Sequence, residues 1–294
     1  MDGPTTDGDL FYIWQAPVFR RIRWVACHRH SHSFSPSTPD AIMTPNPAGL
    51  TEPEQKRYEW QMWSPQCGEA GQLRLRNSTV LISRVGGVGG SAAMALAAAG
   101  VGRLILAHAG SLRLDDLNRQ LLMKTDAIGS SRVACAAERL REINPLIDLV
   151  EVPENMTSEN ADRWIAQADL VIDAAPLFEE RFAMNTAAVR NRKPLIECAM
   201  YDFSARIVVV IPGQTACLQC IYPEQPEHWK RQFPVFAAVS SLTGSLGATE
   251  ALKLLLGSGP SLTGQILTAD LLTMTFRKLP MERNENCPVC RTLS

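Results

Sequence analysis

Long apolar runs are absent from this 294-residue sequence. The alanine-rich stretch from Ala92 to Val101 is well short of the roughly 18–20 residues that a helix needs to cross a bilayer. Its side chains are also small. We therefore expect a buried helix packed closely on a sheet, and no membrane partner.

Charge of one sign is also lacking. Lysine and arginine number 29 and aspartate and glutamate 30, which gives a formal net charge of −1. Nucleic-acid-binding proteins usually carry a basic surface, so this balance predicts no nucleic-acid partner. The chain is 46% hydrophobic and long enough to bury a full core.

Helical and strand periods are missing from the first 50 or so residues, where residues 19–49 mix Arg, His, Ser and Pro. We expect residues 1–50 to be a disordered tail, or part of it to precede a true start at Met43. The segment lacks the apolar core and cleavage site of a secretory signal, which favours the cytoplasm. Residues 51–294 are predicted to form a nucleotide-binding domain with a C-terminal zinc-binding portion.

Strands alternate with helices from about residue 79. The strand-like runs are "TVLIS", "RLILA", "DLVEV", "DLVIDAA" and "KPLIECA", and amphipathic helical segments separate most of them. This alternation predicts an α/β fold with a doubly wound, mostly parallel, Rossmann-like sheet. The later runs "ARIVVVIPG" and "GQILTADLLTMTFRKLP" predict a C-terminal antiparallel extension.

Four of the eight cysteines form two C-x-x-C pairs. These are Cys217 with Cys220 and Cys287 with Cys290. In a chain without an export signal, two such knuckles favour structural zinc over disulfides.

A glycine-rich loop, "RVGGVGG", lies between the first predicted strand and helix. Gly86, Gly87 and Gly89 let the backbone approach a phosphate, and the following helix N-terminus favours an anion. Alone the loop is equally compatible with plain strand–helix packing.

The loop is followed by "DDLNRQ" (115–120), "INP" (143–145), "AMYDFSARIVVVIPGQTACLQC" (199–220), "GSLGATEALK" (244–253) and "CPVC" (287–290). In this order and spacing they resemble the ThiF/MoeB/HesA family. "LTEPEQKRYEWQ" and "CGEAGQLRL" resemble its N-terminal helix and lead-in, so the resemblance covers about residues 50–290.

The resemblance implies an ATP-dependent adenylyltransferase, usually a homodimer with structural zinc. Such an enzyme activates the C-terminal Gly-Gly carboxylate of a ubiquitin-fold sulfur carrier as an acyl-adenylate, in sulfur transfer or metallocofactor biosynthesis. It implies catalytic roles for Arg119 and Arg132, and nucleotide contacts from His108, Asp116, Arg119, Gln120 and Arg132 together with the loop glycines.

Several positions depart from the family pattern. Arg84 replaces the first loop glycine, His108 the ribose-binding acid, Pro176 the metal-handling aspartate, and Trp60 the arginine of "RYxRQ". A neutral imidazole has one acceptor and cannot chelate two hydroxyls as a carboxylate does. Magnesium would have to use Asp173, Glu179, Glu180 or the phosphates alone, and the gain of Arg84 predicts a more positive site.

Three readings therefore stay open. The chain is an adenylyltransferase with a remodelled ATP site, or a catalytically decayed scaffold of the same fold that binds a protein partner. An NAD(P)-dependent dehydrogenase is disfavoured by the missing acid and the zinc knuckles. Trp60 and Trp63, three apart on a predicted helix, favour core or dimer-face anchors over base-stacking platforms.

Overall fold

The computed structural model describes residues 49–226, 229, 232–259 and 261–292, and these fall within one compact unit, residues 47–294. The expectations for residues 1–48 lie outside the described residues. The strands are β1 (Thr79–Ser83), β2 (Arg103–Ala107), β3 (Asp148–Val152), β4 (Leu170–Asp173), β5 (Leu195–Tyr201), β6 (Ser204–Val210), β7 (Gln265–Asp270) and β8 (Thr275–Pro280).

These strands form one sheet in the order β3-β2-β1-β4-β5-β6-β7-β8. The first five run parallel, whereas β6, β7 and β8 pair antiparallel. The predicted fold class, with its antiparallel extension, is confirmed. The strand order reverses between β1 and β4, which places the expected ligand crevice outside the carboxyl ends of these two strands.

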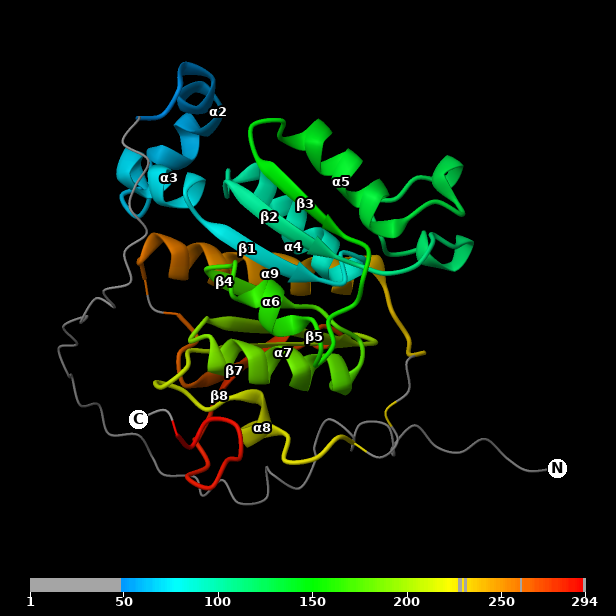
Figure 1. Ribbon diagram of the computed structural model, residues 1–294, viewed down its shortest axis with the longest axis vertical. Coiled ribbons are helices and arrows are strands. Elements are labelled where there is room, and N and C mark those ends of the chain that lie inside the picture. Colours follow the sequence, from blue (N-terminus) through cyan, green and yellow to red (C-terminus); the bar gives the residue numbers. More distant parts are fainter. Residues whose placement is uncertain (1–48, 227–228, 230–231, 260, 293–294) are drawn as a thin grey trace. The chain divides into compact units, whose positions relative to one another are not determined.

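Helices cover both faces of the parallel part (Figure 1). Their bounds are α2 (Glu52–Met62), α3 (Gly68–Arg76), α4 (Gly87–Ala98), α5 (Arg132–Ile143), α6 (Ala161–Ile165), α7 (Phe178–Arg190), α8 (Leu218–Ile221) and α9 (Ala237–Leu256). One core cluster contains residues of α4, α5 and α9, and the other contains residues of α6, α7 and α8. Because both faces are covered, β1 is buried at every residue, as is typical of parallel sheets.

Local signals fix the helix ends. Thr51 and Glu54 form a capping box at the start of α2, and Ser131 caps α5. Helix α9 ends at Gly257, whose φ of 62° is the left-handed conformation common at helix C-termini. Thr51, Glu54 and Ser131 thus mark where α2 and α5 begin, and Gly257 marks where α9 ends.

Close packing of α4 against α9 sets the floor of the site. A Cβ on Gly244 of α9 would overlap the carbonyl oxygen of Val88, and one on Gly247 would overlap the sulfur of Cys198 in β5. The alanine-rich stretch in α4 is thus a buried helix, as predicted, packed on a second helix as well as on the sheet. Cys198 is 1% exposed and acts as a small apolar residue.

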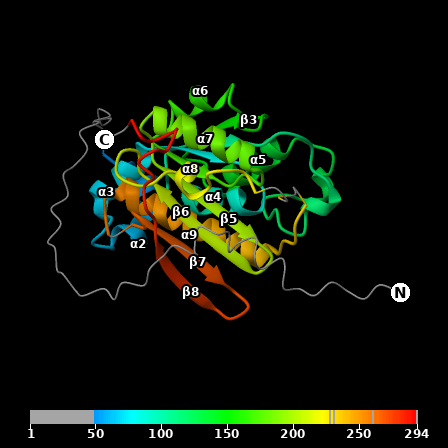
Figure 2. The same cartoon turned by 90° about the horizontal axis from the view of Figure 1, so that it is seen from below.

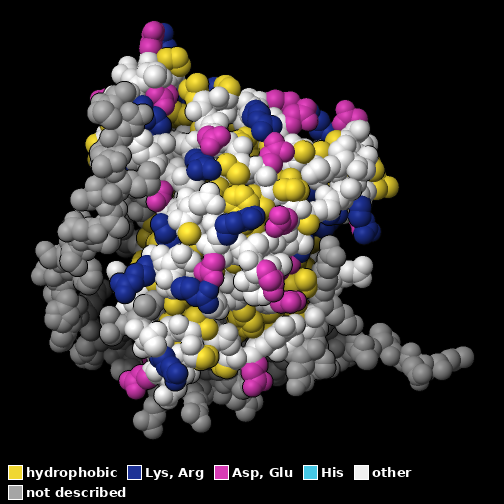
Figure 3. All heavy atoms as spheres, in the orientation of Figure 1, with side chains coloured by type: hydrophobic (Ala, Val, Ile, Leu, Met, Phe, Trp, Pro, Cys, Tyr) yellow, Lys and Arg dark blue, Asp and Glu magenta, His cyan; other side chains and the backbone are white. Residues whose placement is uncertain are grey.

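The remaining surface is mixed in charge. Figure 3 shows Lys and Arg interspersed with Asp and Glu over the face that it presents. Figure 2 shows the β7–β8 hairpin extending away from the helices. Among the described helices, none has the length and apolar character needed to cross a membrane.

Candidate functional site

The glycine loop and the residues after β2 meet at the start of α4. Gly86 is the residue that precedes this helix. A Cβ on Gly86 would lie 3.3 Å from Gln120 Cδ and 3.5 Å from His108 Cε1. A Cβ on Gly87 would lie 3.1 Å from Ser240 and 3.4 Å from Arg119 Cγ. The structure therefore brings these predicted nucleotide-binding residues together at the N-terminus of a helix, where an anion is favoured.

Gly89 lies differently from the other two loop glycines. A Cβ there would stand 2.5 Å from the carbonyl oxygen of Arg84 and 2.8 Å from that of Ser83. Its missing side chain lets α4 pack tightly on the end of β1. Gly89 thus shapes the loop by packing, whereas the space beside Gly86 and Gly87 is bordered by polar side chains.

Asp116 contacts three of the predicted nucleotide-binding residues. It accepts from Arg132 Nε at 3.0 Å and Nη2 at 2.7 Å, and from Gln120 Nε2 at 2.8 Å. Arg119 Nη2 lies 3.4 Å from Asp116 Oδ1, the oxygen that also accepts from Gln120. Burial would raise the pKa of Asp116, but the hydrogen bonds from Arg132 and from the Arg113 backbone outweigh it and lower the pKa. Asp116 is therefore an ionised anchor that orients its basic neighbours.

The two predicted catalytic arginines differ in solvent exposure. The side chain of Arg132 is 10% exposed and fixed by its fork on Asp116, whereas that of Arg119 is 27% exposed. Arg119 Nη1 donates to the carbonyl of Asp115 and to the side chain of Asn118. Arg119 is the more accessible of the two to an incoming anion.

His108 is buried, and its Nδ1 atom has no hydrogen-bond partner. Burial, followed by the charges of Arg84 and Arg132, lowers the pKa of His108 to about 3. The imidazole is thus neutral at physiological pH. Gln120 Oε1 is also buried and unpartnered. Two buried polar atoms beside Gly86 therefore lack a hydrogen-bond partner, and buried polar atoms usually have one. A ligand with hydroxyl groups would satisfy them.

Arg84 forms a buried ion pair with Glu180 at the start of α7. Nε donates to Glu180 Oε2 at 2.8 Å, and Nη2 donates to Oε1. The backbone of Arg84 has a φ of 55°, a left-handed conformation that costs a non-glycine residue about 1–2 kcal/mol. Because Glu180 balances the charge of the guanidinium, Arg84 alone does not make the site more positive, and the expected gain of positive charge stays a prediction.

Asp173, at the end of β4, belongs to a second buried charge cluster. Arg181 Nη1 lies 3.5 Å from Asp173 and 3.1 Å from Glu197, and Arg206 also donates to Glu197. Burial raises the pKa of Asp173 to about 6, although Arg181 opposes the shift. Asp173 is thus held by an arginine, and so is Glu180.

Sequence reasoning missed Ser240 and the role of Glu180 as the partner of Arg84. Ser240 reaches the loop because α9 crosses α4 at close range. The small residues at Gly244 and Gly247 signalled close packing of that helix, but not its partner. Nothing in the sequence indicated that residue 180 faces residue 84.

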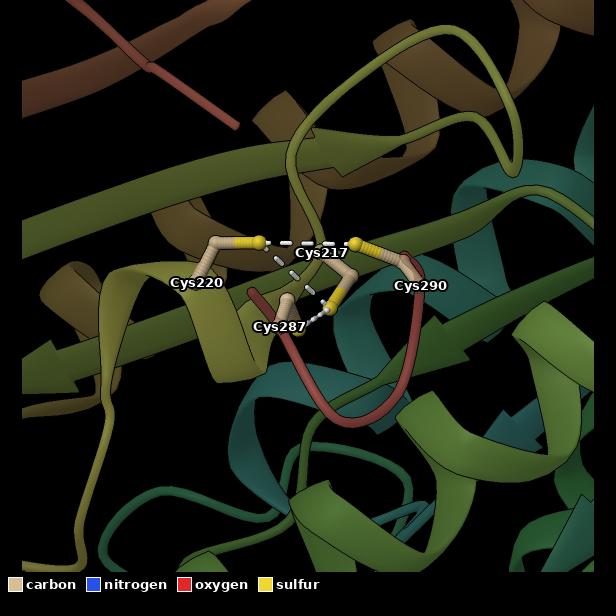
Figure 4. Close-up of side chains that lie close together, drawn as sticks. All are labelled: Cys217, Cys220, Cys287 and Cys290. Atoms are coloured by element: carbon tan, nitrogen blue, oxygen red, sulfur yellow. Dashed lines mark hydrogen bonds between the residues drawn. The ribbon is translucent and has the colours of Figure 1, made fainter. Parts of the chain in front are cut away.

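The four paired cysteines converge on one point (Figure 4). Their sulfurs lie within 4.8 Å of one another, with 3.6 Å between Cys217 and Cys287 and 3.5 Å between Cys220 and Cys290. Four sulfurs about 2.3 Å from a tetrahedral zinc ion would be about 3.8 Å apart. The donor set and its spacing fit a zinc ion, as predicted. The site joins α8 to the segment after β8.

Trp60 of α2 and Trp63, the residue that caps the C-terminus of this helix, stack with ring centroids 5.7 Å apart. They are 79% and 68% exposed, so the prediction that they belong to the core is wrong. Their role as dimer-face anchors stays a prediction.

Comparison with known proteins now decides the family. The model of the ThiF family matches residues 58–289, which include both the glycine loop and the first three paired cysteines. The chain belongs to the ThiF family. The predicted resemblance to ThiF, MoeB and HesA is thereby confirmed.

Relatives of this ThiF-family chain carry two kinds of name. "Protein HesA, heterocyst" from Trichormus variabilis is 48% identical over 241 residues, covering 82% of this chain and 90% of the relative. "Sulfur carrier protein adenylyltransferase" from Thermus thermophilus is 38% identical over 249 residues, covering 82% and 92%. The crystal structure of Escherichia coli MccB with ATP has a TM-score of 0.70 at 22% identity, covering 85% and 77%, and supports the fold.

Proposed function

We propose that this ThiF-family protein is an ATP-dependent adenylyltransferase with a remodelled nucleotide site. Its substrate is the C-terminal Gly-Gly carboxylate of a ubiquitin-fold sulfur-carrier protein, in sulfur transfer or metallocofactor biosynthesis. One observation carries the proposal: the buried atoms His108 Nδ1 and Gln120 Oε1 lie unpartnered at the N-terminus of α4, beside Arg119. This arrangement suits a ligand with both hydroxyl groups and an anionic group, as a ribonucleotide has. The name of the Thermus relative supports the reaction.

The residues suggest how the reaction is assisted. The carrier's carboxylate oxygen attacks the α-phosphorus of ATP, and the bond from that phosphorus to the pyrophosphate oxygen breaks. Charge develops on the phosphate oxygens, where the N-terminus of α4 and Arg119 stabilise it. Arg132 contributes through the ionised Asp116, which keeps Arg119 and Gln120 oriented. The roles of these residues as catalytic and nucleotide-binding groups are part of the proposal.

Two metals are involved in different ways. Zinc on Cys217, Cys220, Cys287 and Cys290 is structural in this proposal, because all four positions of a tetrahedral site are filled by thiolates. Magnesium enters on the nucleotide phosphates. Of the acids considered for it, Asp173 and Glu180 are paired with arginines, and Glu179 is exposed on α7. Magnesium therefore does not fit as an ion held by Asp173 or Glu180.

We further infer that residues 51–294 are the nucleotide-binding domain and that the protein works as a homodimer in the cytoplasm. The exposed stack of Trp60 and Trp63 supports an interface at α2, because two adjacent exposed indoles form an apolar patch of the kind that marks protein–protein contacts.

A catalytically decayed scaffold is the second candidate. It is favoured by Pro176, whose backbone carbonyl accepts a hydrogen bond from Trp229 Nε1 at 2.6 Å and which offers no side-chain ligand. Such a scaffold would bind a protein partner, such as an active relative, without turning over ATP.

Pyrophosphate exchange separates the two candidates. We expect isotope exchange between pyrophosphate and ATP only when a Gly-Gly-tailed carrier is present, and loss of exchange with Arg119→Ala. A carrier ending in Gly-Ala is the matched control. If no carrier encoded in the same genome supports exchange, while the protein co-purifies with an active relative, the scaffold reading replaces the enzyme.

A further inference from the structure

The ion pair between Arg84 and Glu180 spans the point where the strand order reverses. Arg84 follows β1, and Glu180 lies in the first turn of α7, which follows β4. Ligands of open α/β sheets bind in the crevice at this point. The backbone N–H of Arg84 donates to the carbonyl of Ala107, the residue before His108, at 2.6 Å. The charge of Arg84 accordingly helps to lower the pKa of His108. The pair therefore stands beside the unpartnered acceptors of the nucleotide site.

Glu180 holds only one edge of the guanidinium. The fork uses Nε and Nη2 of Arg84, whereas Nη1 has no hydrogen bond within the described part of the chain. Nη1 is also not among the fully buried polar atoms that lack a partner, so it keeps contact with solvent. A guanidinium has five N–H donors in a rigid plane, and one edge can bind a carboxylate while another binds a phosphate.

The acids of this crevice do not suit a metal ion held by the protein. Asp173 is fully buried and held by Arg181, Glu180 is held by Arg84, and residue 176 is proline. A magnesium ligand must be a free oxygen donor, and these two carboxylates are engaged by cations. In place of a metal ligand, the chain has a cation here: the guanidinium of Arg84, which Glu180 holds in position.

We propose that Arg84 binds a phosphate oxygen of the nucleotide through Nη1, that Glu180 is its positioning residue, and that nucleotide binding consequently does not depend on a metal ion held by the protein. The inference rests on the proposed nucleotide site. The left-handed backbone of Arg84 fits this role, because it carries a side chain at a loop position where glycine is the unstrained choice. The cation stands at the phosphate loop itself, so no rearrangement of the sheet is needed to bring it there.

Calorimetric titration with ATP, in magnesium buffer and in EDTA, tests the proposal. We expect the Kd of the wild type to change by less than about threefold between the two buffers. Arg84→Gly should weaken binding in EDTA by about tenfold or more, the usual worth of one charged hydrogen bond. The loss of ATP affinity in Arg84→Gly should be smaller in magnesium buffer, because the ion neutralises part of the phosphate charge. The double variant Arg84→Gly/Glu180→Gln should show the same weakening of ATP binding as Arg84→Gly. It leaves no unpaired buried carboxylate.

Two further variants separate binding from structure. Arg192→Gly is the matched control, since Arg192 also has a left-handed φ, of 54°, but is exposed in the loop after α7. It should leave the ratio of the two Kd values unchanged. Glu180→Gln keeps one acceptor for the guanidinium but loses the two-point fork that orients it, so ATP binding in EDTA should weaken, though by less than in Arg84→Gly. A purely structural pair predicts that Glu180→Gln lowers the unfolding free energy and leaves the ratio of the two Kd values unchanged.

The outcomes are distinct. Equal EDTA sensitivity in the wild type and in both Arg84 variants would overturn the role of Arg84 while leaving the nucleotide site intact. Absence of ATP binding by the wild type in both buffers would overturn the proposed function and this inference with it. A rise in EDTA sensitivity in the Arg84 variants that Arg192→Gly does not show supports the proposal.

Discussion

Replacing His108 with glutamine should make the protein less sensitive to acid. The pKa of His108 is lowered to about 3 in the folded protein, against about 6.5 in the unfolded chain. Below pH 6.5 the unfolded chain therefore binds a proton that the folded protein does not, and stability falls as the pH decreases. Between about pH 7.5 and about pH 5 this loss is about 2 kcal/mol, since the linkage amounts to about 1.4 kcal/mol per pH unit.

Asp173 acts in the opposite direction over the same range. Its pKa is raised to about 6 in the folded protein, so it takes up a proton more readily than in the unfolded chain. This uptake stabilises the fold on acidification by about 1.4 kcal/mol at about pH 5, relative to a reference carboxyl near 3.9. The wild-type pH profile alone therefore hides most of the His108 contribution.

Urea unfolding of the wild type and of His108→Gln at both pH values isolates the contribution of His108, with tryptophan fluorescence as the signal. The Asp173 contribution is common to both proteins and cancels in the difference. We expect the difference in unfolding free energy to shift by about 2 kcal/mol in favour of the variant at the lower pH. A difference that stays constant to within about 0.5 kcal/mol would show that His108 titrates normally, and the neutral acceptor at the site would be refuted.

Three further outcomes are expected. Cys290→Ser should release zinc at chelator concentrations that leave the wild type loaded, as measured by metal analysis after dialysis. Gly247→Ala should lower the unfolding free energy by about 1–3 kcal/mol, because its Cβ overlaps Cys198 Sγ, and adding Cys198→Ala should recover part of the loss in urea melts. Trp60→Ala combined with Trp63→Ala should raise the dimer dissociation constant about tenfold or more in sedimentation velocity, and an unchanged constant would remove α2 from the interface.

Much of the fold could be predicted because its signals are local. Short apolar runs such as Thr79–Ser83 alternate with helical segments, and this period alone indicates a parallel sheet. The zinc site could be predicted because each C-x-x-C pair is a local motif. The neutralisation of Arg84 could not be predicted, since it depends on Glu180, 96 positions away along the chain.

The family motifs located the site but not its charge state. They brought His108 and Asp116 to the same crevice, yet only burial and the surrounding arginines determine that the first is neutral and the second ionised. The exposure of Trp60 and Trp63 could not be predicted either, because their spacing fits a buried and an exposed helix face equally well.

The tight seam between α4 and α9 limits how this site can change over time. Gly244 leaves no room for even a methyl group against α4, and Gly247 leaves none against Cys198 in β5, so α9 cannot slide without collisions. The backbone beneath the glycine loop is thereby fixed. New ligand preferences must then arise from the side chains next to this loop, such as Arg84 and His108. An evolving lineage can exchange such residues one at a time, while the floor that they share is inherited unchanged.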